Sequence, residues 1–158
     1  MYKEKIKTKE EIKQICEELK RQGKTIVTTN GSFDVINVGH ANLVHECKKQ
    51  GDILVVGLNS DISIKQYKGS DRPINIQRHR AWLLAAFKDV DYITIFNETD
   101  PREFIKNIEP NFHCNSSEYG EDCIEAETVK QGGGKLVLIP RFTEEGVSSS
   151  KIIDELKK

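Results

Sequence analysis

Apolar residues recur along this chain first at helical and then at strand spacing. From residue 12 to residue 19 they follow one another at intervals of three and four, which places them on one face of a helix. Thr8 and Glu11 have the spacing of a capping box at the start of this helix, and Gly23 is a typical stop. The pattern therefore predicts a helical segment within residues 1–23.

The remaining chain alternates between short apolar runs and amphipathic stretches. The run at 53–58 is apolar throughout, as expected of a strand covered on both faces. Residues 65–75 are basic and rich in turn formers, which predicts a loop. Strands are predicted at 25–29, 53–58, 92–96, 112–114 and 136–139, and helices at 40–51, 78–87, 101–108, 124–130 and from 148 onward.

This alternation predicts a doubly wound α/β domain of Rossmann-like type. Strand followed by helix throughout implies a parallel sheet with right-handed crossovers. We expect one domain over residues 1–158, with the helix of 1–23 as an N-terminal appendage to a core of 24–158. In such folds ligands bind at the carboxyl ends of the strands, where loops lead into helices.

Composition excludes several classes of function. The 158 residues carry 24 Lys and Arg against 25 Asp and Glu, so no overall field favours nucleic acid or an anionic membrane. Four cysteines form no CxxC pair, and we expect reduced thiols and no metal ligands. The N-terminus lacks the apolar stretch of a signal peptide, and no segment approaches a membrane span. The prediction is a cytoplasmic protein whose anion binding is local.

The loop after the first predicted core strand carries the residues best suited to chemistry. It has the sequence NGSFDVINVGH over residues 30–40. Gly31 permits close approach of a phosphate just before a helix N-terminus. Asn37 and His40 are three residues apart and share one face of the first helical turn. Within this loop we expect His40 to face the ligand, although a histidine that merely satisfies the helix start is the alternative.

Two other segments are suited to anions. Residues 140–151 lead into the last predicted helix, where three serines, free N–H groups and Lys151 can hold a polyphosphate. An N-cap with spare serines is the alternative there. The loop at 65–75 can present Lys68 over a reacting phosphate, and Arg80 either reaches the same anion or forms a structural ion pair.

These motifs resemble a known superfamily. NGSFDVINVGH is similar to the NGxFDxxHxGH signature of the cytidylyltransferase-like superfamily, and GVSSSKII resembles its second signature, ISTTKI or ISSTxxR. Within it, KGSDRPIN, HRAWLLAAFKDVDYI and QGGGKLVLIP are most similar to the adenylyltransferase domain of bacterial ADP-heptose synthases. The next most similar group is the glycerol-3-phosphate cytidylyltransferases, which the run IPRFTEEGVSSSKI resembles. The resemblance covers essentially the whole chain.

The resemblance implies transfer of a nucleoside monophosphate, with AMP favoured, from a nucleoside triphosphate to a sugar phosphate such as heptose 1-phosphate. Pyrophosphate is released, Mg²⁺ accompanies the triphosphate, and the enzyme is expected to be a homodimer. One alternative is a CTP-dependent enzyme acting on glycerol 3-phosphate or a similar polyol phosphate. Another is a weakly active nucleotide-binding module.

The resemblance also implies roles for individual residues, with no protein ligand to a metal. Asn37 replaces the first histidine of the signature, and Asn115-Ser116-Ser117-Glu118-Tyr119 replaces a KGGDY-like run of the heptose enzymes. The implied catalytic residues are His40, Lys68 and Asn37, and the implied substrate-binding residues are Asp34, Lys68 and Arg80. The implied nucleotide-binding residues are Asn30, Gly31, Ser32, Phe33, Gly39, His40, Asn115, Ser148, Ser149, Ser150 and Lys151.

Overall fold

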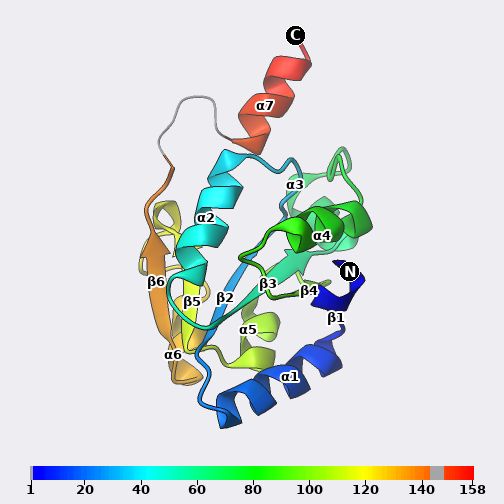
Figure 1. The fold of residues 1–158 in the computed structure, drawn as a ribbon. Coiled ribbons are helices and arrows are strands. Elements are labelled where there is room, and N and C mark those ends of the chain that lie inside the picture. The colour runs from blue at the N-terminus through cyan, green and yellow to red at the C-terminus, as the bar shows by residue number, and fades with distance from the viewer. Residues whose placement is uncertain (1, 143–147) are drawn as a thin grey trace.

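A parallel sheet forms the centre of the molecule, in the strand order β1-β4-β3-β2-β5-β6 (Figure 1). The computed structural model describes residues 2–142 and 148–158. All five strand pairings within these ranges are parallel, which confirms the predicted doubly wound class. The strands are β1 (Ile6–Lys7), β2 (Ile26–Gly31), β3 (Ile53–Asn59), β4 (Tyr92–Phe96), β5 (Phe112–Ser116) and β6 (Lys135–Ile139).

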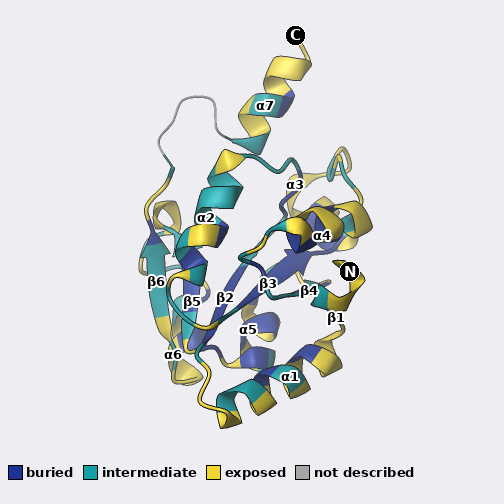
Figure 2. Cartoon of the chain, viewed as in Figure 1, coloured by how far each residue is buried: buried dark blue, intermediate teal, exposed yellow. Residues whose placement is uncertain are grey.

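Helices cover both faces of the sheet, and each face has its own apolar core. Side chains of α2 and α4 pack on one face, and those of α1, α5 and α6 pack on the other. Burial is deepest in the central strands β2 and β3 (Figure 2). The α-helices are α1 (Lys9–Arg21), α2 (Val38–Lys48), α3 (Asp61–Lys68), α4 (Gln77–Ala86), α5 (Arg102–Ile108), α6 (Ala126–Gln131) and α7 (Ser149–Leu156); short 3₁₀ turns are η1 (Tyr2–Lys5) and η2 (Ser117–Tyr119).

The N-terminal segment is part of the sheet, whereas the sequence predicts a helical appendage. The capping box of α1 is present, and Ile12 is fully buried in the core beneath the sheet. Ahead of this helix, β1 pairs with β4, and the Lys5 ammonium group donates to the carbonyls of Phe87 and Val90 at 3.1 and 2.7 Å. A strand of two residues has no periodicity of its own, so the pattern could not reveal it.

Helix α3 replaces the first part of the predicted loop at 65–75. The Ser60 hydroxyl accepts the backbone N–H of Ser63 at 3.1 Å and caps this helix. Ile64 is buried, but Ile62 is exposed, so the helix has too narrow an apolar stripe to stand out in the sequence. Lys68 is its last residue.

Helix α4 is more exposed than its sequence predicts. Trp82 and Leu83 are 37% and 50% exposed, although the apolar run around them predicts a buried helix. Leu84 is buried as expected, and the Arg78 guanidinium lies 5.0 Å from the centroid of the Trp82 ring. The tryptophan therefore lies on the surface beneath an arginine. Across the described part of the chain, no helix has the length and apolar character needed to cross a membrane.

Candidate active site

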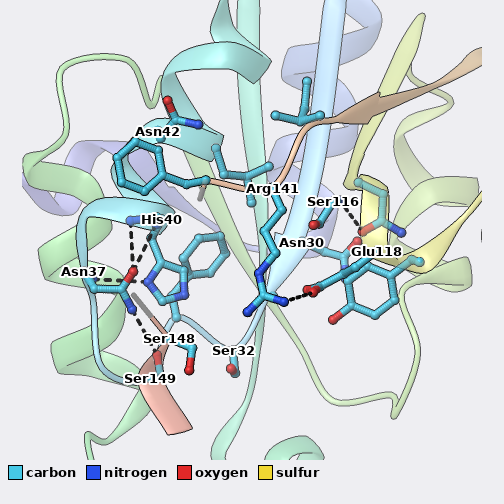
Figure 3. A pocket seen from close by; sticks show the side chains of 18 of the residues that line it. Asn30, Ser32, Asn37, His40, Asn42, Ser116, Glu118, Arg141, Ser148 and Ser149 are labelled. Atoms are coloured by element: carbon cyan, nitrogen blue, oxygen red, sulfur yellow. Dashed lines mark hydrogen bonds and ion pairs between the residues drawn. The ribbon is translucent and has the colours of Figure 1, made fainter. Parts of the chain in front are cut away.

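A pocket of about 280 Å³ opens at the carboxyl edge of the sheet. The ends of β2, β5 and β6 form its floor, and the N-termini of α2 and α7 form one wall (Figure 3). This is the place where the sequence predicts ligand binding. The pocket brings together most of the predicted site residues: Asn30, Gly31, Ser32, Phe33, Asn37, Gly39, His40, Lys68, Asn115, Ser148, Ser149 and Ser150.

Several pocket residues are not among the individual site residues predicted from the sequence, although Arg141 lies in the predicted anion-binding segment 140–151 and Glu118 in the run 115–119. Arg141, just beyond β6, reaches across the pocket to Glu118 with an N–O distance of 3.3 Å. Figure 3 shows this pair facing His40 and Ser148 from the other side of the pocket. The sequence signal for Arg141 and Glu118 was that each follows a predicted strand, at the edge of the sheet where ligands bind. The other additional lining residues are Asn42, Leu43, Ser116, Tyr119, Ile139, Pro140 and Phe142.

Asn37 and His40 cap the first turn of α2 reciprocally. The Asn37 side-chain oxygen accepts the backbone N–H groups of Gly39 and His40 at 3.0 and 3.4 Å. In return, the backbone N–H of Asn37 donates to Nδ1 of His40 at 3.2 Å. Since Nδ1 is the acceptor, the proton of the neutral ring lies on Nε2.

The imidazole of His40 is neutral at neutral pH. Burial lowers its pKa below the usual value, and the positive charge of Lys68 lowers it further. The ring also packs against Phe33, with 5.2 Å between the ring centroids. His40 therefore presents a fixed Nε2–H donor to the pocket without a positive charge, which suits a hydrogen bond to a phosphate oxygen.

Lys68 supplies a positive charge to the pocket from the end of α3. Its ammonium group donates to the Ser32 hydroxyl at 3.1 Å and lies 5.5 Å from the centroid of the Tyr67 ring. Partial burial lowers the pKa of Lys68, and the neighbouring charge of Arg72 adds to this. An anion that enters the pocket relieves this repulsion between cations.

Asp34 is buried, although the sequence places it among the substrate-binding residues. Only 1% of Asp34 is exposed, and its carboxylate accepts from Arg72 Nε and from the backbone N–H groups of Ile74 and Asn75 at 2.8–2.9 Å. Burial alone would raise its pKa, but the donors of Asn75, Ile74 and Arg72 outweigh this and lower it. Asp34 thus fixes the loop after Lys68 and has no free oxygen for a substrate.

Arg80 is also structural, which is the second of the two roles considered for it. Its side chain is fully buried and donates to the Asp61 carboxylate and the Asn75 carbonyl, both at 2.9 Å. It donates as well to the carbonyl of Ser32. A buried guanidinium needs such partners because desolvation is costly. Arg80 therefore supports the pocket wall from behind.

The start of α7 is the third element of the site. The Ser148 hydroxyl caps this helix by accepting the backbone N–H of Lys151 at 3.1 Å. Lys151 is not among the residues that line the pocket, and its contact with a nucleotide stays a prediction. Residues 143–147, which belong to the predicted phosphate-binding segment, lie outside the described residues. Nowhere in 2–142 or 148–158 do three His, Cys, Asp or Glu residues gather as a metal site.

The fold and the site together define a class. A doubly wound parallel sheet, with a pocket between two helix N-termini at its carboxyl edge, is a nucleotide-binding α/β architecture. A cationic lysine and a neutral histidine donor face this pocket from different elements. Such a site is equipped to position a polyphosphate and stabilise charge on it.

Comparison with known proteins identifies the family. The family model described as Cytidylyltransferase-like matches residues 28–155, and the chain belongs to this family. It is therefore a nucleotidyltransferase. The sequence resemblance stated above is confirmed at this level.

Curated relatives are similar over nearly the whole chain. The bifunctional protein HldE of Nitratiruptor sp. is 40% identical over 153 residues, which are 96% of this chain and 32% of the relative. The protein of the same name from Aliarcobacter butzleri is 46% identical over 137 residues, 82% of this chain and 29% of the relative. The chain thus spans about a third of the length of these relatives.

Solved structures share the fold. A lipopolysaccharide core biosynthesis protein from Thermoplasma volcanium superposes with a TM-score of 0.62 at 26% identity, covering 78% of this chain and all of the other. Pantoate-beta-alanine ligase from Francisella tularensis gives 0.65 at 14% identity, covering 97% of this chain and 79% of the other. At that low identity the second likeness concerns the fold alone.

Proposed function

We propose that this domain transfers AMP from ATP to the phosphate of a sugar phosphate, such as heptose 1-phosphate, with release of pyrophosphate. The similarity to HldE and the resemblance to ADP-heptose synthases support this donor and acceptor. The observation that carries the proposal is the arrangement of His40. Its ring is locked by the Asn37 N–H, and its free Nε2–H belongs to a pocket that also contains Lys68 and the first turn of α7.

The proposed reaction is an in-line displacement at the α-phosphorus. An oxygen of the acceptor phosphate forms the new bond to phosphorus while the bond to the β-phosphate oxygen breaks. The acceptor is already anionic, so no general base is required. Catalysis then consists of positioning and electrostatic stabilisation.

Each element of the pocket has a task in this reaction. His40 donates a hydrogen bond to oxygens of the α-phosphate and the leaving group, where negative charge accumulates. Lys68 offsets the repulsion between the acceptor phosphate and the α-phosphate. Ser148, Ser150 and the N–H groups of α7 hold the β- and γ-phosphates. Phe33 and Gly31 line the crevice for the rest of the nucleotide.

Mg²⁺ is proposed to arrive with the triphosphate. This ion commonly keeps several waters and binds through substrate phosphates instead of a protein cage. When bound, the ion shields the charge of the departing pyrophosphate.

A pyrophosphate-release screen tests the proposal. Four nucleoside triphosphates are combined with sugar 1-phosphates and polyol phosphates, and we expect the highest kcat/KM for ATP with heptose 1-phosphate. Higher activity with CTP and glycerol 3-phosphate would replace this proposal by the cytidylyltransferase alternative. Nucleotide binding without pyrophosphate release from any pair would leave the binding-module alternative. The homodimer and the cytoplasmic location remain predictions, the first of which light scattering can check.

A further inference from the structure

Three hydrogen bonds connect Val35, Asn37 and Ser149, and two of them join the loop before α2 to the first turn of α7. The side-chain amide of Asn37 donates to the carbonyl of Val35 at 3.2 Å and to the hydroxyl of Ser149 at 3.4 Å. The Ser149 hydroxyl donates in turn to the same Val35 carbonyl at 2.8 Å. Figure 3 shows Asn37 and Ser149 meeting at the wall of the pocket. These groups form a closed triangle between two elements that are more than a hundred residues apart.

The amide of Asn37 is fully occupied by these contacts. An asparagine side chain has two N–H hydrogens, and here one is directed at Val35 and the other at Ser149. Its oxygen accepts two backbone N–H groups of α2. A direct bond from Asn37 to a phosphate would require the loss of one of these partners.

Helix α7 has little other support. It extends away from the sheet beyond the N-terminal end of α2 (Figures 1 and 2). Within α7, every residue of which is described, Ile153 alone is buried, and Leu156 is 82% exposed. The position of its first turn therefore depends strongly on the hydrogen bonds of Ser149.

We propose that Asn37 is a positioning residue, which holds the first turn of α7 in place for the triphosphate through Ser149 instead of binding the reacting phosphates itself. This rests on the proposed function, in which α7 receives the β- and γ-phosphates. The chemistry explains an asparagine at this position. A neutral imidazole has one N–H donor and one acceptor, so it cannot accept from α2 and also donate to both Val35 and Ser149.

The test uses Asn37→Ser, Ser149→Ala and the double variant of the full chain. Serine keeps an acceptor for the cap of α2 but is too short to reach Ser149. Thr8→Ala is the matched control, because it removes the cap of α1, far from the pocket. Two quantities are measured: amide hydrogen exchange of residues 149–156 without ligand, and the Kd of ATP, CTP and inorganic triphosphate.

Both single variants are expected to speed exchange in α7 and weaken triphosphate binding by about two- to tenfold, the range for loss of one hydrogen bond. The double variant should match Ser149→Ala, because that change already removes both bonds between the loop and α7. Thr8→Ala should leave both α7 exchange and triphosphate binding unchanged.

Three results would overturn the inference. The first is a fall in kcat for Asn37→Ser with unchanged exchange in α7, which means direct contact with the reacting phosphates. The second is additivity of the two single variants. The third is unchanged amide exchange of α7 in both single variants. If the wild-type chain binds none of the three polyphosphates, the proposed function fails, and the exchange data still decide whether Asn37 positions α7.

Discussion

His40 shows how a single side chain acquires its role from its neighbours. The backbone of Asn37 determines which ring nitrogen carries the proton, and burial together with Lys68 keeps the ring neutral. The spacing of the loop predicts that Asn37 and His40 share a face, because helical geometry alone determines this. The state of the ring depends on burial and on Lys68, 28 residues away in sequence, which no local pattern reports.

His40→Ala should lower kcat much more than it weakens nucleotide binding. Removal of one preorganised donor typically costs about 10²–10³ in rate. The Kd should change less, because Lys68 and α7 still bind the triphosphate. Pyrophosphate release and urea midpoints of the same preparation measure both effects. An active enzyme that is merely less stable, by about 1 kcal/mol, would show that His40 only completes the helix start.

His113 should make the fold sensitive to acid. Its fully buried ring lies 2.8 Å from the Thr28 hydroxyl through Nδ1, and burial lowers its pKa to about 3. Below the unfolded value of about 6.5, the unfolded chain binds a proton that the native chain does not, so stability falls as pH falls. The slope is about 1.4 kcal/mol per pH unit, or on the order of 2 kcal/mol between pH 6.5 and 5.

His113→Asn separates this effect from other titrations, because asparagine can still bond to Thr28 but does not titrate. The free energy of unfolding, from urea titrations at pH 7, 6 and 5, should fall less steeply for this variant. Its stability at pH 7 should be lower, since a smaller side chain leaves a cavity. An equal slope in both proteins would assign the acid sensitivity to other groups.

Asp34 and Arg80 mark where reasoning from single residues fails. Both are charged and both lie within runs that carry the resemblance, which implies contact with substrate. Their partners are far away in sequence: Arg72 is 38 residues from Asp34, and the Ser32 carbonyl is 48 residues from Arg80. Burial of these charges follows from tertiary pairing, which the sequence pattern does not contain.

At the scale of elements, periodicity identifies most helices and strands, including the short α5 and α6, and misses two elements without a distinct apolar pattern. The helices α1, α2 and α4 and the strands β3, β4 and β6 lie within a few residues of their predicted positions, since each has a clear apolar face. Helix α3 and strand β1 were missed, because eight residues with one exposed isoleucine, or two residues of edge strand, give no distinct period.

The turn after β5 and the segment after β6 meet through Glu118 and Arg141, and this pair should compete with nucleotide. Glu118→Gln frees the guanidinium for the triphosphate, so the Kd should decrease. The gain should be at most about fivefold, since a half-exposed pair is worth up to about 1 kcal/mol. Titration calorimetry measures it, and Glu103→Gln, which breaks an exposed pair on α5, controls for the charge change. Weaker binding by Glu118→Gln would mean that Glu118 itself contacts the ligand.

Strand β3 and helix α5 approach so closely that a glycine is required between them. A Cβ atom added to Gly57 would lie 2.7 Å from Cε1 of Phe104. Gly57→Ala should therefore lower the free energy of unfolding by about 1–3 kcal/mol. Phe104→Leu, combined with it, should recover part of this loss in urea titrations. A Gly57→Ala protein of unchanged stability would show that α5 can shift freely.

The whole molecule combines a shared architecture with a chain-specific site. Strand order and pocket position follow from rules for parallel sheets, which is why the sequence predicts the sheet edge where the pocket lies. The same architecture recurs in a protein of 14% identity. The polar groups that face the pocket are determined instead by pairings between distant segments of the chain. These pairings could be identified only from the structure.

The N-terminal strand should contribute to the stability of the whole sheet. A chain that begins at Thr8 loses β1, its pairing with β4 and both hydrogen bonds of Lys5. We expect the free energy of unfolding to fall on the order of 2–4 kcal/mol. We also expect the newly exposed edge of β4 to promote self-association. Urea titrations and light scattering measure the two effects, and an unchanged urea midpoint would support the predicted N-terminal appendage of residues 1–23.

The place of β1 in the sheet also sets an order of assembly during synthesis. Lys5 and Val90, which it brings together, are 85 residues apart. At a translation rate of about 5–20 residues per second, roughly 4–17 s pass between their appearance. Neighbouring strands β2 and β3 can pair during this interval, because contacts close in sequence form first. Strand β1 therefore joins the sheet only after β4 has been made.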